Sequence, residues 1–156
     1  MAWNDFAQLP SQAFAAKLPR ARWPGWWQKQ VAALESRVIT VEGFVMAARH
    51  EGKEAANCDD ETLHDVHLML ASSLDDPRGQ WLVAELTPRI RINHPAWHMK
   101  KLRRLARDHR RVRLTGWPLY DQEHLNAVGQ SRLSPWEIHP VVRIEVMRED
   151  GVWMEW

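Results

Sequence analysis

The 156-residue sequence predicts a mainly β fold with one internal helix. Five segments alternate apolar and polar residues with a period of two, which is typical of half-buried strands. Between the third and the fourth of them, one segment places its apolar residues at helical spacing instead. The composition, with 45% hydrophobic and 26% charged residues, is that of a folded globular protein, and a chain of this length fits one domain. We therefore expect a single small β-barrel.

The first part of the chain, residues 1–37, is expected to form an N-terminal arm followed by a helix. Three prolines interrupt the first 24 residues, which favours short helical pieces over one continuous helix. Residues 25–37, GWWQKQVAALESR, then place Trp27, Val31 and Leu34 at helical spacing. This segment is predicted to be an amphipathic helix that packs on the barrel.

The first three strands are predicted from alternating segments separated by turn-forming residues. The first covers residues 37–47, RVITVEGFVMA, and the pattern marks Gly43 as a bulge. A polar loop over residues 50–62 separates it from the second strand, residues 64–70, HDVHLML. The turn SSLDDPRG then leads as a hairpin into the third strand, residues 80–87, QWLVAELT.

The internal helix and two more strands complete the predicted elements. The helix is expected over residues 93–109, with Pro95 in its first turn. The fourth strand follows in residues 110–121, where Gly116 favours a bend. The fifth covers residues 136–147, WEIHPVVRIEVM.

Five strands with one helix between the third and the fourth is the element order of the OB-fold, a five-stranded Greek-key barrel. The predicted fold is therefore an OB-fold-like barrel over residues 38–148, with the N-terminal helical arm before it and a C-terminal tail over residues 149–156. OB-folds commonly bind oligonucleotides or oligosaccharides on the outer face of strands two and three.

The charges, the hydropathy and the single cysteine argue against a membrane protein and against an exported, disulfide-bonded one. A net charge of +1 gives no general attraction to polyanions, but residues 54–76 hold seven acids and residues 89–113 hold ten basic residues. No apolar run approaches the roughly 18 residues that span a membrane. The lone Cys58 cannot form an intramolecular disulfide, and the N-terminus lacks the pattern of an export signal. We expect a cytoplasmic protein without a membrane partner.

The basic segment and the ten tryptophans favour binding of single-stranded DNA or RNA. Proteins that bind single strands combine a cationic groove with aromatic side chains on which bases stack. The candidate binding residues are Trp81, Arg89, Arg91, Lys100, Arg104, Arg113, Trp117 and Trp136. The interpretation conflicts with the acidic residues that the strand pattern places on the expected binding face, because these repel phosphates unless a cation neutralises them.

Acid and imidazole side chains recur in pairs, which suggests a metal site. The candidate ligands are Asp65, His67, Asp121, His124, Glu137 and His139, and Glu85 on the third strand is the candidate general base. Imidazole nitrogen with carboxylate oxygen suits a divalent transition metal such as Zn²⁺ or Mn²⁺, which can activate water for hydrolysis. No spacing here matches a dedicated metal motif, so a solvated, structural role for these side chains stays open.

The sequence contains no motif for a serine or cysteine nucleophile or for a P-loop that hydrolyses nucleotides. The chain contains no Gly-x-Ser-x-Gly motif and no glycine-rich phosphate loop, and Cys58 lies among acids that disfavour a thiolate. His50, His64 and His94 follow no pattern.

Several segments resemble a group of uncharacterised bacterial proteins. They are DVHL at 65–68, AELTPR at 84–89, RLTGWPLYDQEH at 113–124 and WEIHPV at 136–141, together with Asn57 and Cys58. The resemblance extends from about Ile39 to Val146, and WEIHPV is its most recognisable part. It implies a small OB-type barrel and points to the acid and imidazole residues above, but it implies no reaction.

Three functions follow from these observations. The leading hypothesis is an OB-fold module that binds single-stranded nucleic acid or a related anionic polymer. The first alternative is a metal-dependent hydrolase, for example a phosphodiesterase or nuclease. The second is a structural or partner-binding domain that uses Trp23, Trp26 and Trp27 as an interface. The sequence leaves the ligand and the oligomeric state open.

Overall fold

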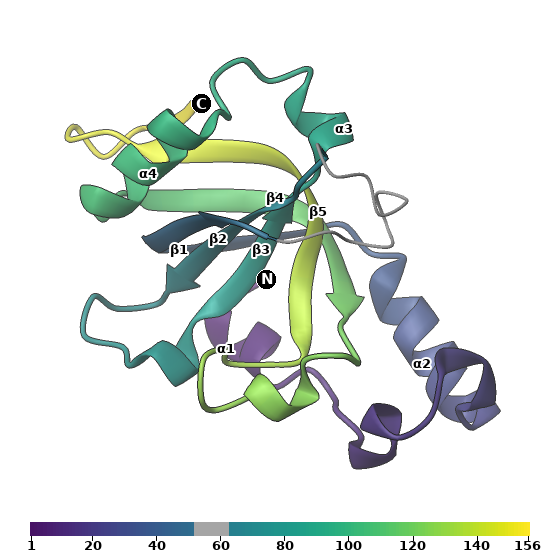
Figure 1. Cartoon of the computed structure of the whole chain (residues 1–156). Helices are drawn as coiled ribbons and strands as arrows, with labels where there is room; N and C mark the ends of the chain where they lie inside the picture. The colour runs from purple at the N-terminus through teal and green to yellow at the C-terminus, as the bar shows by residue number, and fades with distance from the viewer. Residues whose placement is uncertain (52–62) are drawn as a thin grey trace.

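The computed structural model of the chain describes residues 1–51 and 63–156 (Figure 1). The predicted polar loop, including Cys58, lies almost entirely outside the described residues. No helix among the described residues is both long enough and apolar enough to cross a bilayer.

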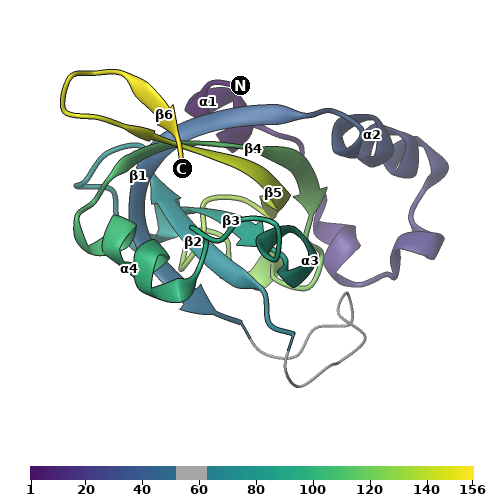
Figure 2. The ribbon, with the colours of Figure 1, turned by 90° about the horizontal axis from the view of Figure 1, so that it is seen from above.

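Five strands close into a mixed β-barrel, which Figures 1 and 2 show from the side and from above. They are β1 (Ile39–His50), β2 (Val66–Ala71), β3 (Leu82–Leu86), β4 (Arg111–Tyr120) and β5 (Trp136–Met147). The antiparallel order is β3-β2-β1-β4-β5, and a parallel pairing of β3 with β5 at Ala84 and Ile138 closes the barrel. The predicted OB-fold-like architecture is therefore confirmed.

Strand β1 differs from its predicted form in length and in the place of its bulge. It continues to His50 and pairs there with Val66 of β2. Its register against β2 shifts between Val45 and Ala47, whereas Gly43 pairs regularly with β4, so the predicted bulge at Gly43 is wrong. A side chain at Gly43 would lie 2.8 Å from the carbonyl oxygen of Ala71, so the glycine is required by close backbone approach instead.

The internal helix begins later than predicted. Helix α4 covers Met99–Arg107, and a separate short helix α3 covers Pro88–Arg91. Residues 93–98 form turns between them, because a residue before proline is disfavoured in helical conformation and His94 precedes Pro95. Helix α4 buries one apolar stripe and directs its basic residues to solvent.

The N-terminal segment packs into the same core as the barrel. It contains α1 (Trp3–Ala7), α2 (Gly25–Glu35) and the short 3₁₀ helices η1 (Ala13–Ala16) and η2 (Arg20–Arg22). Phe6, Trp23 and Trp27 belong to the core cluster that the barrel strands form. The indole nitrogen of Trp136 in β5 donates a hydrogen bond of 2.8 Å to the carbonyl of Pro10. The arm therefore covers one end of the barrel core.

The C-terminal residues also pair with the barrel. Strand β6 (Trp153–Glu155) adds to β5, an element too short for the sequence pattern to reveal. The indole nitrogen of Trp97, which is buried before α4, donates a hydrogen bond of 3.0 Å to the carbonyl of Trp156. The predicted tail thus contributes a strand and an anchor for the segment between β3 and α4.

Candidate metal centre

Three strands bring acid and imidazole side chains to one face of the barrel. In the antiparallel pairing of β2 with β3, His67 lies opposite Glu85. Because Ala84 pairs with Ile138 in the parallel closure, Glu85 also lies beside Glu137 and His139 of β5. Side chains alternate along a strand, so these residues lie on the face opposite the core residues Ala84 and Ile138.

We call these four residues and Asp65, which directly precedes β2, the acid–imidazole cluster: Asp65, His67, Glu85, Glu137 and His139. The cluster is not a solvated surface. Asp65 has no exposed area, and Glu137, Glu85 and His67 are 3%, 5% and 8% exposed. Buried carboxylates are costly unless they are paired or bind a cation, so the contacts within the cluster decide what it can do.

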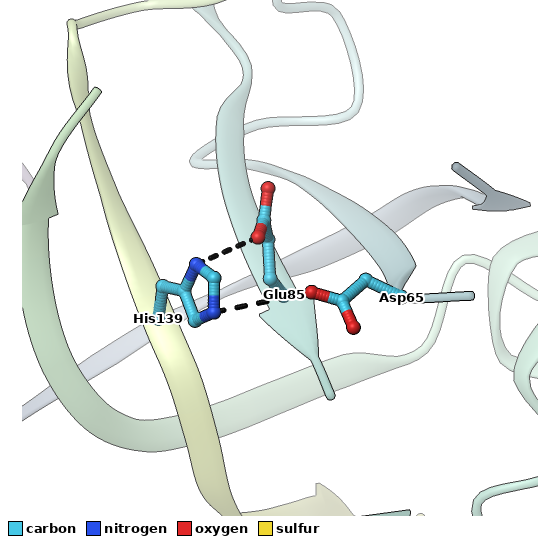
Figure 3. A group of neighbouring side chains, drawn as sticks. All are labelled: Asp65, Glu85 and His139. Atoms are coloured by element: carbon cyan, nitrogen blue, oxygen red, sulfur yellow. Dashed lines mark ion pairs between the residues drawn. The ribbon is translucent and has the colours of Figure 1, made fainter. Parts of the chain in front are cut away.

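Asp65, Glu85 and His139 converge most closely (Figure 3). Nδ1 of His139 lies 2.8 Å from Oε2 of Glu85, and its Nε2 lies 3.9 Å from Oδ2 of Asp65. One potential ligand atom from each residue lies within 4.8 Å of the other two. Among the described residues, this is the one group of three acid, imidazole or thiol side chains with that spacing.

His67 holds Glu85 from its other side and is itself held by Glu51. Nε2 of His67 contacts Oε1 of Glu85, and Nδ1 of His67 lies 3.0 Å from Oε1 of Glu51. The imidazole thus bridges two carboxylates. Glu51 was missing from the sequence-predicted site because β1 was expected to end at Ala47, whereas its extension to His50 places Glu51 beside His67.

The loop after β4 reaches the cluster through Arg132. This guanidinium, 5% exposed, donates a hydrogen bond of 2.8 Å from Nη2 to Glu137 and another from Nη1 to Asp121. Asp121 also contacts Nδ1 of His124 at 2.7 Å. The pair Asp121 and His124 is therefore linked to the cluster only indirectly, through Arg132 and Glu137.

The charges of the cluster compensate one another. Burial alone would lower the pKa of His139, but Glu137 and Glu85 outweigh it and raise that pKa to about 10. Burial favours the neutral form of Glu85, yet its bonds to His139 and His67 hold its pKa well below the ordinary range. Glu85 also raises the pKa of His67 against the effect of burial. For Glu137, burial prevails and raises the pKa above its usual value.

The six predicted metal ligands thus fall into two groups. Asp65, His67, Glu137 and His139 meet on one face together with Glu85, whereas Asp121 and His124 form a separate pair. Arg132 joins the two groups, and its sequence neighbours Ser131 and Leu133 gave no sign of this role.

The predicted nucleic-acid residues are less uniform in their exposure. Arg89, Lys100 and Arg104 are exposed, and Trp81, Arg91, Arg113 and Trp117 are partly buried. Nη2 of Arg111 and Nε of Arg113 both bond to Glu42, so part of that positive charge is paired. Trp136 is fully buried, and a buried indole cannot stack on a base, so its predicted binding role is wrong.

Comparison with known proteins gives no relative to which these residues can be matched. No family model matches the chain, and no significant match is found among curated proteins or among solved structures. The resemblance carried by WEIHPV and the expected cytoplasmic location therefore stay predictions. What the geometry defines is a class: an OB-fold-like barrel with a buried acid–imidazole cluster on the outer face of β2, β3 and β5.

Proposed function

We propose that Asp65, Glu85 and His139 bind one divalent transition metal ion, Zn²⁺ or Mn²⁺, and that the protein is a metal-dependent hydrolase. The convergence of their ligand atoms within 4.8 Å, from three separate parts of the chain, carries this proposal. Bonds of about 2.0–2.2 Å to one ion require ligand atoms no more than about 4.4 Å apart. A shift of a few tenths of an ångström in one side chain would bring the set to that spacing.

The chemistry of the donors supports a transition metal. One imidazole nitrogen and two carboxylates form a mixed nitrogen and oxygen set, which suits Zn²⁺ or Mn²⁺. Because only a neutral imidazole binds a metal, binding would release the proton that Glu137 and Glu85 favour on His139. His67 would hold Glu85 in position, and its own second nitrogen faces Glu51 at 3.0 Å. Such carboxylate–imidazole contacts behind a ligand are typical of metal centres, where they orient the ligand.

Apolar side chains lie beside the cluster on the same face of the sheet. Met69 of β2 pairs with Val83 of β3, each two residues away from the cluster residue on the same face of its strand, and they are 3% and 4% exposed. Apolar side chains thus fill this layer two residues further along. Replacing a buried ionic group with packed apolar residues is often neutral or stabilising, so a buried cluster of five ionisable groups favours a functional explanation.

A metal ion at this point would polarise a substrate oxygen and lower the pKa of a bound water, which is the chemistry of hydrolysis. The residues of the chain would hold the metal ion in place. Arg132 holds Glu137, and Glu137 in turn lies 3.5 Å from Nδ1 of His139. Glu85, the predicted general base, contacts both imidazoles, and we therefore assign it to the ligands instead.

Metal content and thermal stability test the proposal. Protein purified without a His tag should bind about one equivalent of Zn²⁺ or Mn²⁺, and a hundredfold excess over Kd should stabilise it by about 2.7 kcal/mol. That corresponds to a rise in Tm of about 5–10 °C for a chain of this size. Glu85→Gln and His139→Gln should abolish both effects.

His124→Gln is the matched control, because it removes an imidazole from the same side of the molecule but outside the ligand group. It should bind the metal like the unchanged protein. Less than about a tenth of an equivalent of metal in the unchanged protein, with no thermal shift, would overturn the proposal. Equal loss in the control would place the site elsewhere.

Binding of single-stranded nucleic acid is a second candidate function, supported by the outer face of α4. This helix exposes Lys100, Lys101, Arg103, Arg104 and Arg107 while it packs against β1 through its apolar stripe. Arg104 and Arg107 share Asp108 as an ion-pair partner. The affinity of the protein for labelled single-stranded DNA should fall steeply as the salt concentration rises. The double variant Lys100→Gln/Arg103→Gln should bind the DNA more weakly still. Binding that does not depend on salt, or no binding at micromolar protein, would contradict this candidate function.

The third hypothesis, a partner-binding surface of N-terminal tryptophans, has less support. Trp23 and Trp27 are buried, 4% and 0% exposed, and they pack on each other and on Tyr120. Of the three, only Trp26 presents a substantial exposed area.

A further inference from the structure

A pocket of about 380 Å³ lies beside the acid–imidazole cluster. Four histidines that followed no common sequence pattern line it together with Arg91: His50, His64, His94 and His98. They come from the end of β1, the segment before β2 and the turns between α3 and α4. The rest of the lining is apolar and includes Ile92 and Trp97. This volume is within the range of small-molecule sites, which is about 300–1,000 Å³.

One side of the pocket is cationic. Arg91 donates from Nη1 to the carbonyl of His64 at 3.0 Å and from Nε to the carbonyl of Trp97 at 3.4 Å, which fixes its guanidinium in place. The rings of His50 and His64 lie 6.3 Å apart beside it. Burial, followed by the charges of Arg91 and Arg103, lowers the pKa of His50, so the positive field reaches across the pocket. Such a field favours an anion.

The other side is planar and apolar. The ring of His94 stacks on Trp97 with centroids 3.9 Å apart and planes inclined by 12°. Trp97 is buried and is anchored through its indole nitrogen to Trp156. Ile92, beside this stack, has 81% of its surface exposed. A rigid aromatic stack next to an exposed aliphatic side chain is suited to a flat ring of the ligand.

Adjacent residues link the pocket to the proposed metal centre. His64 lines the pocket, and Asp65, the next residue, belongs to the metal centre. Arg91 donates a hydrogen bond to the backbone carbonyl of His64, and its guanidinium interacts electrostatically with Asp65. A ligand whose anionic group lies at Arg91 would therefore have that group next to the metal centre.

We propose that this pocket binds a nucleoside phosphate, with the phosphate toward Arg91 and His64 and the base against His94 and Ile92. The role of the pocket as the substrate site rests on the proposed hydrolase function, since it places a phosphate ester beside the metal centre. The histidines themselves do not form a second metal site by the spacing criterion, which only Asp65, Glu85 and His139 meet among the described residues. The same ligand chemistry occurs in a free nucleotide and at the end of a nucleic-acid strand.

Calorimetry with adenosine 5′-monophosphate, adenosine and inorganic phosphate tests the pocket. EDTA is present, so that metal binding makes no contribution. The monophosphate should bind about tenfold or more tightly than either fragment, because it alone reaches both the cationic and the planar side. A 5′-phosphorylated oligonucleotide that binds more tightly than the monophosphate would assign the ligand to a strand end, and equal binding would assign it to a free nucleotide.

Ile92 provides a pair of variants at one exposed position. Ile92→Glu should weaken monophosphate binding about fivefold to tenfold more than Ile92→Lys does, because both variants lose the apolar contact with the base but only the glutamate repels the phosphate. The high exposure of Ile92 means that neither change should disturb folding. Equal effects of the two variants, or a monophosphate that binds no better than adenosine and phosphate alone, would overturn the proposal.

A variant at His94 and a control at Asn93 test the planar side of the pocket. His94→Ala should weaken binding of the monophosphate about tenfold, whereas Asn93→Ala, at an exposed neighbour outside the pocket lining, should leave it unchanged. Failure of the hydrolase proposal would look different. The unchanged protein would then bind no metal while its binding of the monophosphate in EDTA remained intact.

Discussion

Arg132 connects two carboxylates from different elements, Asp121 after β4 and Glu137 in β5. Burial opposes ionisation of Asp121, but the charges of Arg132 and His124 outweigh it and hold the pKa of this carboxyl below its ordinary value of 3.8. Because the folded-state pKa is the lower one, the ionised carboxylate stabilises the fold above about pH 3.8. That stabilisation is lost as the pH falls through the folded-state pKa.

The variant Asp121→Asn tests this residue. It should lower the free energy of unfolding by about 1–3 kcal/mol at pH 7, because Arg132 then loses one of its two charged partners. The deficit relative to the unchanged protein should shrink below about pH 3.8, because the carboxyl of its unfolded chain takes up a proton there before that of the folded protein does. Urea unfolding at pH 7, 5 and 3 measures it.

His124→Ala is the control for this measurement, since its side chain is 61% exposed and its contact with Asp121 is accessible to water. Its cost should stay below about 1 kcal/mol. A deficit of Asp121→Asn that is the same at pH 3 as at pH 7 would mean that the carboxylate charge does not stabilise the fold.

At the scale of the element, the pairing of β4 with β5 determines where His139 lies. The register between these strands shifts on both sides of Gly116. A side chain at Gly116 would lie 2.3 Å from the carbonyl oxygen of Pro140 and 2.7 Å from Ile138. These two residues flank His139, so the close approach at Gly116 positions one of the proposed ligands.

Gly116→Ala should therefore destabilise the protein by about 1–3 kcal/mol, because the backbone of β5 must move. It should also weaken metal binding, since that movement displaces His139. Gly25→Ala is the matched control: nothing lies within 4 Å of a side chain at Gly25, in the first turn of α2. The control should be neutral or slightly stabilising by urea unfolding, and equal loss in both variants would exclude the close approach as the cause.

At the scale of the whole molecule, the N-terminal segment and the barrel have one continuous core. Phe6 of α1 has no exposed surface and belongs to the same cluster as the strand residues. Arg20 bonds to both carboxylate oxygens of Glu35 and to the carbonyl of Tyr120 at the end of β4. We therefore expect the two parts to unfold together.

Phe6→Ala tests this expectation. The substitution should cost about 3–5 kcal/mol, as for other fully buried aromatic residues, and should lower the stability of the barrel as a whole. Tryptophan fluorescence and far-ultraviolet circular dichroism should report one coincident unfolding transition in both proteins. Two separate transitions, with the barrel transition unchanged in the variant, would show that the N-terminal segment folds independently.

The order and the type of most elements could be predicted because they depend on local periodicity. The fifth strand was predicted at Trp136–Met147, and the structure places it there. The errors lie where tertiary contacts or chain geometry override the local pattern. The helix begins at Met99 because Pro95 restricts the residue before it, and Gly43 is required by the backbone of Ala71 and not by a bulge.

By itself, the sequence determined which side chains share a face of each strand, because that depends only on the period of two. It thus placed His67 and Glu85 on adjacent strands with the same orientation. Only the tertiary structure decided that His139 meets Asp65 and Glu85, since the parallel closure of β3 on β5 joins residues far apart in the chain. The tertiary structure also buried Trp136 and formed the histidine-lined pocket, neither of which a local pattern can encode.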